Sequence, residues 1–234
     1  MNVAVIPARG GSKRIPRKNL KPFCGLPIIA HSIRAAIDAK VFDRIVVSTD
    51  DPEIASYAKS EGAEAPFVRP ASLSDDHATT VPVIKHAIEW IQEHRSPVGN
   101  VCCLYATAPF VRARDLQAAH SILVERKVGA YVFSATSFPF PIQRAFRVAK
   151  DGHVEMFEPA NYDKRSQDLE PAYQDAGQFY WGSAGAFIRN EMFFARESIA
   201  YLLPRHRVQD IDTPEDWTRA ELMFRMLADE GDRS

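Results

Sequence analysis

Short apolar runs alternate, up to about position 135, with stretches in which apolar residues recur at helical spacing. Apolar runs bounded by polar or turn residues are typical of buried parallel strands. The predicted strands are Val3–Ile6, Arg44–Ser48, Ala65–Val68, Asn100–Tyr105 and Ala130–Ser134, and the predicted helices are Pro27–Ala39, 52–62, Thr79–His94 and Ala113–Arg126. This alternation predicts an α/β fold of three layers, α/β/α, around a mostly parallel sheet with right-handed crossovers.

The alternation breaks between positions 136 and 177, where aromatic, proline and polar residues replace the periodic pattern. We therefore expect one α/β domain, residues 1–135 and 178–234, with an inserted arm or lid at 136–177. Phe138, Phe140 and Phe146 in this insertion either pack on a second copy of the chain or fold back on its own core. Beyond it the pattern predicts a regular element at Gly185–Ile188, a helix near 190–197, an extended segment at Val208–Ile211, and a helix from Pro214 to about Ala228.

Charge and cysteine content narrow the class of protein. The 234 residues carry 29 basic and 30 acidic side chains, a net charge of -1, which argues against nucleic acid or a membrane surface as a partner. No apolar run approaches the length of a membrane span, and the first residues lack the layout of a signal peptide. Cys24, Cys102 and Cys103 have neither disulfide nor metal-ligand spacing, so we expect reduced thiols in a cytoplasmic protein.

Basic residues are concentrated in the loop after the first strand. This loop contains two glycines, a serine, and the cations Arg9, Lys13, Arg14, Arg17 and Lys18. Small residues let backbone N–H groups approach an anion, and the cations neutralise it, so the loop indicates a polyphosphate site. The alternative is a solvated basic surface run. The loop matches neither the G-x-G-x-x-G dinucleotide pattern nor a Walker motif.

Two acidic residues near the C-terminus, Asp210 and Asp212, flank Ile211. In an extended segment, residues two apart face the same side, so both carboxylates converge. Mg²⁺ prefers a few carboxylates together with substrate phosphates, which suits a site facing a polyphosphate. The alternative is that Asp212 only borders the capping box of Thr213 and Asp216 at the start of the last helix.

Four loops follow the predicted strands and should line one crevice, because ligands bind at the carboxyl ends of parallel strands. They are 9–19, 48–51, 69–80 and 105–112. Arg69, at the end of a strand, is a candidate ligand contact, whereas Ser74, Asp75 and Asp76 also fit a helix cap. The seven histidines are scattered, with no serine or cysteine partner indicated by spacing, so we expect no catalytic triad.

Three motifs carry a family resemblance. They are R-x-G-S-K-x-x-x-x-K-N at Arg9, Gly11, Ser12, Lys13, Lys18 and Asn19; R-P-x-x-L-x-x-D at Arg69, Pro70, Leu73 and Asp76; and D-I-D-T-x-x-D-[FW] at Asp210–Thr213, Asp216 and Trp217. Together they resemble the CMP-sialic-acid synthetase family, the cytidylyltransferases that activate nine-carbon 2-keto sugar acids. The likeness covers nearly the whole chain.

The resemblance implies a Rossmann-like nucleotidyltransferase fold similar to GT-A, a homodimer, Mg²⁺ as cofactor, and transfer of CMP from CTP to the sugar acid with release of pyrophosphate. It implies catalytic roles for Arg9, Lys18, Asp210 and Asp212, with the two aspartates also as metal ligands. The implied nucleotide-binding residues are Ala8, Arg9, Gly10, Gly11, Ser12, Lys13, Asn19, Arg69, Ser74 and Asp76.

One segment departs from the sialic-acid pattern. Leu104-Tyr105-Ala106-Thr107-Ala108-Pro109 stands where sialic-acid members carry Leu-Gln-Pro-Thr-Ser-Pro. With the segment from Asp175 to Trp181, it resembles the members of the family that act on pseudaminic acid, and an aromatic wall suits methyl and acetamido groups. The implied sugar contacts are Tyr105, Thr107, Gln178, Tyr180 and Trp181. The alternatives are a synthetase for N-acetylneuraminic or legionaminic acid, a GT-A glycosyltransferase using the Asp-x-Asp pair, and a non-catalytic sugar-nucleotide sensor.

Overall fold

Six strands form one sheet in the order β10-β6-β9-β5-β1-β4. The computed structural model describes residues 1–75 and 78–231. The strands are β1 (Asn2–Pro7), β4 (Arg44–Ser48), β5 (Asn100–Leu104), β6 (Tyr131–Ser137), β9 (Tyr173–Ser183) and β10 (Ile199–Leu202). β1 pairs in parallel with β4 and β5, and β10 with β6, whereas β9 runs antiparallel to both its neighbours. The prediction of a mostly parallel sheet is therefore confirmed.

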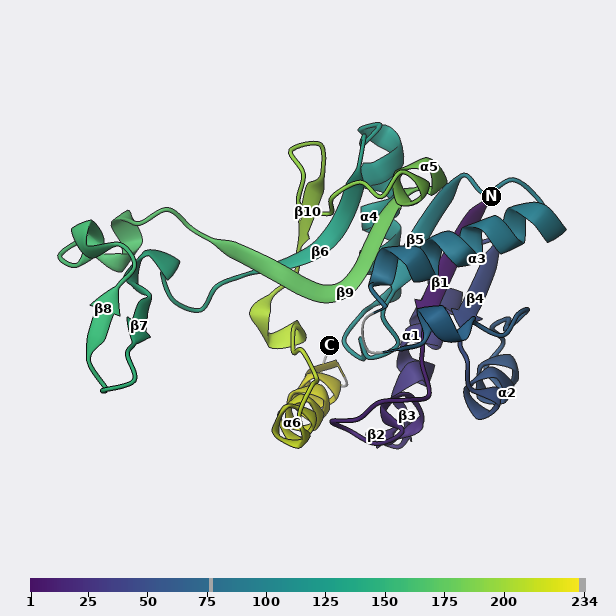
Figure 1. The fold of residues 1–234 in the computed structure, drawn as a ribbon, viewed down its shortest axis with the longest axis horizontal. Helices are drawn as coiled ribbons and strands as arrows, with labels where there is room; N and C mark the ends of the chain where they lie inside the picture. Colours follow the sequence, from purple (N-terminus) through teal and green to yellow (C-terminus); the bar gives the residue numbers. More distant parts are fainter. Residues whose placement is uncertain (76–77, 232–234) are drawn as a thin grey trace.

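Helices cover both faces of the sheet (Figure 1). On one face, α1 (Ile28–Ala39), α2 (Pro52–Ser60) and α4 (Ala113–Glu125) pack through buried apolar residues such as Ile33, Ile54 and Leu116. On the other, α3 (Thr80–His94) and α5 (Ala184–Ile188) contribute Ile84, Ile88 and Phe187. Because the central strands are apolar on both sides, burying both faces removes all of their side chains from water. This is the predicted three-layer arrangement.

A third apolar cluster holds the last helix, α6 (Pro214–Gly231), against the N-terminal half of the chain. Phe23, the last residue of the short strand β2 (Pro22–Phe23), meets Trp217 edge-on at 5.4 Å between ring centres. β2 pairs with β3 (Leu26–Pro27). Ile211 is buried in the same cluster. The segment with the two aspartates is therefore fixed beside the loop that follows β1.

The strand β9 joins the sheet to a projecting arm, residues 138–172 (Figure 1). β6 and β9 stay paired out to Ser137 opposite Tyr173. Beyond them lies a hairpin of β7 (Phe146–Val148) and β8 (Val154–Met156). Because β9 runs opposite to β5, with Leu104 facing Phe179, residues 174–177 arrive beside the carboxyl end of β5.

Large apolar side chains of the arm lie on its surface. Phe140 is 80% exposed, and Phe146, Val148 and Val154 are also exposed. Of the two outcomes expected for the aromatic residues of the insertion, packing on the chain's own core does not occur for Phe140 or Phe146. Within the ranges that the structure describes, no helix is long and apolar enough to cross a membrane.

Several sequence-based expectations are wrong. Residues 65–68 form no strand: Glu64 makes a single bridge to Val46, and Pro66 then removes a donor that a ladder needs. Residues 190–197 form turns, because the preceding helix is α5 and Asn190 ends it with φ 56°. The regular element at 185–188 is this helix, and strands β9 and β10 were not predicted.

Candidate active site

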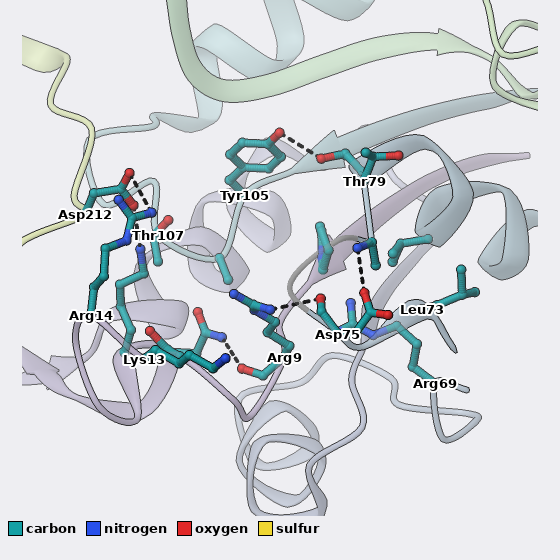
Figure 2. A pocket seen from close by; sticks show the side chains of 18 residues that line it. Arg9, Lys13, Arg14, Arg69, Leu73, Asp75, Thr79, Tyr105, Thr107 and Asp212 are labelled. Carbon is teal, nitrogen blue, oxygen red and sulfur yellow. Dashed lines mark hydrogen bonds and ion pairs between the residues drawn. The ribbon is translucent and has the colours of Figure 1, made fainter. Parts of the chain in front are cut away.

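A cavity of about 680 Å³ opens at the carboxyl edge of the sheet, between the ends of β1 and β5 and the start of α3. Figure 2 shows it extending from Arg14 and Asp212 at one end to Arg69 and Leu73 at the other. Its wall includes the cations Arg9, Lys13, Arg14, Lys18 and Arg69, and the carboxylates Asp75 and Asp212. In a chain with a net charge of -1, this excess of positive charge favours an anionic ligand.

Hydrogen bonds fix the backbone of the glycine-rich loop, residues 9–19. The Gly10 N–H donates to Asp50 Oδ1 at 3.0 Å, and Asn19 Nδ2 donates to the Arg9 carbonyl at 2.9 Å. A Cβ on Gly10 would lie 2.6 Å from Asp51 Oδ2, which explains glycine at this position. The Gly10 amide, expected to face a phosphate, is thus held by Asp50 in this structure, and the loop instead presents Arg9, Ser12 and Lys13 to the cavity.

Arg69 is a buried cation in the cavity wall. Its side chain is only 4% exposed, and its Nη2 lies 3.6 Å from Asp50 Oδ1. Its Nε donates to Ser74 Oγ at 3.1 Å, so Ser74 orients it. Burial lowers the pKa of Arg69 and Asp50 opposes this shift, but a guanidinium remains charged at neutral pH. A buried charge with so little neutralisation is well placed to receive an anion.

Asp212 lies at the same end of the cavity as Arg14 and contacts cations of the basic loop (Figure 2). Arg14 Nη2 lies 2.9 Å from Asp212 Oδ2, and Lys18 Nζ lies 3.4 Å from Oδ1. Lys18 also donates to the Ile211 carbonyl at 2.6 Å. On the helix side, Asp216 accepts from the N–H of Asp212 at 3.2 Å. Asp212 therefore lines the cavity, while Thr213 and Asp216 cap the helix in the same segment.

The side chains of Asp210 and Asp212 are the candidate metal ligands of the site. Loss of hydration, and next the Asp212 carboxylate, raise the pKa of Asp210 above its ordinary value, and Lys18 opposes this shift. Two hard oxygen donors that disfavour each other's charge fit a divalent cation such as Mg²⁺. In the part of the chain that the structure describes, no group of three or more acidic, histidine or cysteine side chains could hold a metal. The remaining ligands would therefore be phosphate oxygens and water.

A second cavity of about 500 Å³ adjoins the first, and Tyr105 lines both. Gln174, Asp175, Tyr180 and Asp210 contribute to its wall. The Tyr105 hydroxyl lies 3.0 Å from Thr80 Oγ1, and the Tyr180 hydroxyl donates to Asp175. Burial raises the pKa of Tyr105 to about 12, so both phenols are neutral hydrogen-bonding groups. Asp212 lines the first cavity and Asp210 the second, so the aspartate pair lies where they meet.

Comparison with known families places the chain. The model of the cytidylyltransferase family matches residues 3–213, nearly the full length. The chain belongs to this family. Membership of the family means that the chain is an enzyme, a cytidylyltransferase. The glycosyltransferase and sensor alternatives are therefore set aside.

Individual relatives extend the match. The chain is 44% identical over 225 residues to a pseudaminic acid cytidylyltransferase of Campylobacter jejuni, covering 96% of this chain and 97% of the relative. It is 31% identical over 231 residues to a CMP-N,N'-diacetyllegionaminic acid synthase of Legionella pneumophila, covering 96% of each. A solved CMP:2-keto-3-deoxy-manno-octonic acid synthetase complexed with CTP superposes with TM-score 0.69 at 17% identity, covering 96% of this chain and 98% of the other, and shares the fold.

The predicted nucleotide residues of this cytidylyltransferase come together at the first cavity in most cases. Arg9, Ser12, Lys13, Asn19 and Arg69 line it, and Ser74 touches it through Arg69. Lys18, predicted to be catalytic, and Thr107, predicted to contact the sugar, line the same cavity. Ala8 is buried at the end of β1, and Gly10 and Gly11 contribute backbone to the loop. Asp76 lies outside the described residues.

Two of the predicted sugar contacts lie elsewhere. Trp181 is fully buried and stacks on Phe42 at 4.9 Å, because it points to the opposite face of β9 from Tyr180. Gln178 is buried and donates from Nε2 to the Arg207 carbonyl at 2.6 Å. Neither lines the cavity that holds Tyr105 and Tyr180.

Sequence reasoning missed several residues of the cytidylyltransferase site. Thr79 and Thr80 begin α3 at the first cavity, and Asp50 holds both Gly10 and Arg69. Arg14 was noted only as part of a basic loop. The position of Asp50 at the end of a buried strand is a signal that could have found it, whereas the threonines resemble any helix start.

Proposed function

We propose that this cytidylyltransferase transfers CMP from CTP to the anomeric hydroxyl of a nine-carbon 2-keto sugar acid, and that the acid is pseudaminic acid. The observation that carries the proposal is the 44% identity, over nearly the whole of both chains, to a relative named for pseudaminic acid. The two adjoining cavities support it, because one is basic enough for a triphosphate and the other offers aromatic and hydrogen-bonding groups to a sugar.

In this proposal the nucleotide occupies the basic cavity. The triphosphate lies against Arg9, Lys13, Arg14 and Lys18, while Arg69 and the threonines at the start of α3 border the nucleoside. When CTP binds, Lys18 exchanges its contact with Asp212 for one with a phosphate, because a triphosphate carries more negative charge than a single carboxylate. Arg9 and Lys18 then stabilise the negative charge that grows as pyrophosphate leaves, which is the main source of catalysis in phosphoryl transfer.

The sugar acid occupies the second cavity, with its anomeric hydroxyl directed past Tyr105 toward the α-phosphorus. The hydroxyl oxygen loses its proton to water and forms the new bond to the α-phosphorus. The bond from the α-phosphorus to the oxygen that departs with pyrophosphate breaks in line. Asp210 and Asp212 would hold Mg²⁺ at the junction; when bound, the ion supplies positive charge to the phosphate oxygens. Tyr105 and Tyr180 provide a neutral aromatic wall for the methyl and acetamido groups of the acceptor.

The proposal includes a homodimer formed through the arm. Phe146, Val148 and Val154 lie on one face of the β7–β8 hairpin, whereas the opposite face carries the ion pair of Arg147 with Glu155. A two-stranded hairpin with one exposed apolar face is not stable alone in water. A second copy of the arm would bury that face. A reaction that consumes CTP, in a chain whose cysteines are free thiols, also supports action in the cytoplasm.

The test is a panel of nonulosonic acids supplied with CTP and Mg²⁺ and scored by release of pyrophosphate. We expect pseudaminic acid to react with the highest kcat/KM, and legionaminic and N-acetylneuraminic acids to react far more slowly. Asp212→Asn, which removes one anionic oxygen at nearly constant shape, is the control and should abolish most turnover. Equal rates with N-acetylneuraminic acid would overturn the specificity, and no pyrophosphate with any acid would overturn the activity.

A further inference from the structure

A buried ion pair lies beneath the segment that carries the two aspartates. Arg207 Nη1 lies 2.6 Å from Asp115 Oδ2, and Nη2 lies 3.2 Å from Oδ1, so the contact is bidentate. The side chains are 6% and 2% exposed. Arg207 ends the turn Arg205–Arg207, and Asp115 lies in the first turn of α4. The pair therefore joins the approach to Asp210 to a helix on one face of the sheet.

Stability alone is a weak explanation for this pair. Removing two charges from water is unfavourable, and replacing a buried ion pair with apolar residues of similar size is often neutral or stabilising. The structure nevertheless satisfies Asp115 fully: it also accepts from the Arg112 N–H at 3.2 Å and from the Tyr201 hydroxyl at 3.3 Å. Such a network fixes direction and position more than it adds free energy of folding.

Arg207 is held at its backbone as well. Gln178 Nε2 donates to the Arg207 carbonyl at 2.6 Å, and Gln178 itself is buried in β9. The strand curves here, with Gly177 at φ 60° and a register shift between Phe133 and Ala135 of β6. Arg207 is therefore held by two elements: its guanidinium pairs with Asp115 of α4, and its carbonyl accepts from Gln178 of β9.

The segment that follows is held by side-chain contacts: Lys18 donates to the Ile211 carbonyl, and Gln209 Nε2 donates to the Asp210 carbonyl at 2.7 Å. Residues 208–212 belong to no helix or strand. Ile211 is buried, and Asp216 holds the N–H groups of Asp212 and Thr213 at the far end. Asp210 is therefore fixed from the near side by Arg207 and from the far side by Ile211 and the start of α6. Arg207 is the contact before Asp210 that ties this segment to α4 and β9.

We propose that Arg207, Asp115 and Gln178 are positioning residues that hold Asp210 and Asp212 in the arrangement that binds the divalent cation. The proposal rests on the proposed function for the identity of the metal site. It also reassigns Gln178, because a side chain that grips the Arg207 carbonyl inside the protein acts on the acceptor only through the aspartate segment. Residues of this kind typically change metal affinity by about 10–100-fold.

The experiment replaces the ion pair by apolar residues, Arg207→Met with Asp115→Leu, and measures Mn²⁺ binding in the presence of CTP by electron paramagnetic resonance. We expect the double variant to unfold cooperatively at a urea midpoint close to that of the wild type. We expect its affinity for Mn²⁺ to fall about 10-fold or more. The Mg²⁺ concentration for half-maximal activity should rise in parallel, with an unchanged KM for CTP at saturating metal.

Two further variants keep the proposal open to contradiction if the double variant does not fold. Gln178→Met removes only the bond to the Arg207 carbonyl, and Arg207→Lys keeps the charge but loses the fork; both should weaken Mn²⁺ binding. Arg34→Met with Glu61→Leu, which removes a bidentate pair on the surface of α1 and α2, is the matched control and should bind Mn²⁺ as the wild type does. Unchanged Mn²⁺ affinity in a folded Arg207 or Gln178 variant would overturn the proposal. Because the readout needs no acceptor, it does not depend on pseudaminic acid being the substrate.

Discussion

Lys18 is the cation that links the phosphate loop to the aspartate segment, through its contacts with the Ile211 carbonyl and Asp212. We predict that Lys18→Ala lowers kcat by about 10²–10³, equivalent to about 2.7–4 kcal/mol of transition-state stabilisation. The loss should appear in kcat as well as in the KM for CTP, because charge grows on the phosphates during transfer. Steady-state assays of pyrophosphate release measure both.

Lys21 provides the matched control for this change. It lies three residues farther along the same segment, over the ring of Trp217 at 4.4 Å, and outside the cavity wall. Lys21→Ala should leave kcat within about twofold of the wild type, since this half-buried side chain does not line the cavity. Equal losses in the two variants would mean that the loop acts as a general basic surface.

Tyr105 separates the two cavities and should govern acceptor choice. We predict that Tyr105→Gln lowers kcat/KM for the preferred sugar acid by about 10–100-fold, because a polar amide replaces an apolar wall. The KM for CTP should change by much less. Tyr105→Phe keeps the ring and loses only the bond to Thr80, so it should retain most of the activity. A larger loss of kcat/KM in Tyr105→Phe than in Tyr105→Gln would mean that the hydroxyl, not the ring, governs acceptor choice.

At the scale of elements, the start of α6 both caps a helix and shapes the site. Asp216 accepts from the side chain and N–H of Thr213 and from the N–H of Asp212, and these bonds lower its pKa. A depressed carboxyl pKa contributes stability above the ordinary Asp value and loses it as the pH falls through the depressed value. We predict that Asp216→Ala lowers the free energy of unfolding by about 1 kcal/mol at pH 7.

The pH dependence distinguishes this contribution from packing. The difference between the wild type and Asp216→Ala should be constant from pH 7 to about pH 5. It should shrink below about pH 4, as the pH falls from the ordinary Asp value through the depressed pKa of the folded state. Urea unfolding at pH 7, 5 and 3.5 measures it, with Glu215→Gln in the same helical turn as the control. A difference that persists undiminished at low pH would contradict the electrostatic origin.

The elements that the sequence predicts well are those whose burial is visible in a few adjacent residues. β1, β4 and β5 are apolar on both faces, so each one is visible without knowledge of its partners. β9 is different, because its first half is polar and exposed, and only its long-range antiparallel pairing with β5 and β6 makes it a strand. Pairing between strands that are far apart in the sequence produces no local pattern of apolar residues from which a strand could be predicted.

The site residues also divide into those that a local motif predicts and those that depend on long-range strand pairing. The basic loop and the aspartate pair are short motifs whose chemistry is local, and the structure places Arg9, Lys18 and Asp212 around one cavity. Tyr180 and Trp181 are neighbours in sequence but lie on opposite faces of β9, so the assignment of both to the sugar needed a strand direction that the sequence did not reveal.

At the scale of the whole molecule, the exposed hairpin of the arm determines the oligomeric state that we propose. We predict that the wild-type chain sediments as a dimer in analytical ultracentrifugation. Val148→Glu with Val154→Lys places a compensating charge pair on the apolar face, opposite one another in the hairpin, and should give a monomer that remains folded.

The opposite face of the hairpin supplies the control. Arg147→Ser with Glu155→Ser removes the ion pair there and should leave the dimer intact. A monomeric wild type, or a dimer in the charged variant, would remove the arm from the interface. Activity measured on the same samples shows whether the acceptor cavity depends on the second copy.

The arm leaves the sheet through β6 and returns through β9 as one paired ribbon, with Ser137 opposite Tyr173 (Figure 1). The two ends of the arm therefore lie side by side, at Ser137 and Tyr173. The residues between them can be replaced by another segment without disturbing the pairing of β6 with β9 inside the sheet. Chimaeras cut at the same pair would show how far acceptor preference is inherited separately from the chemistry of CTP.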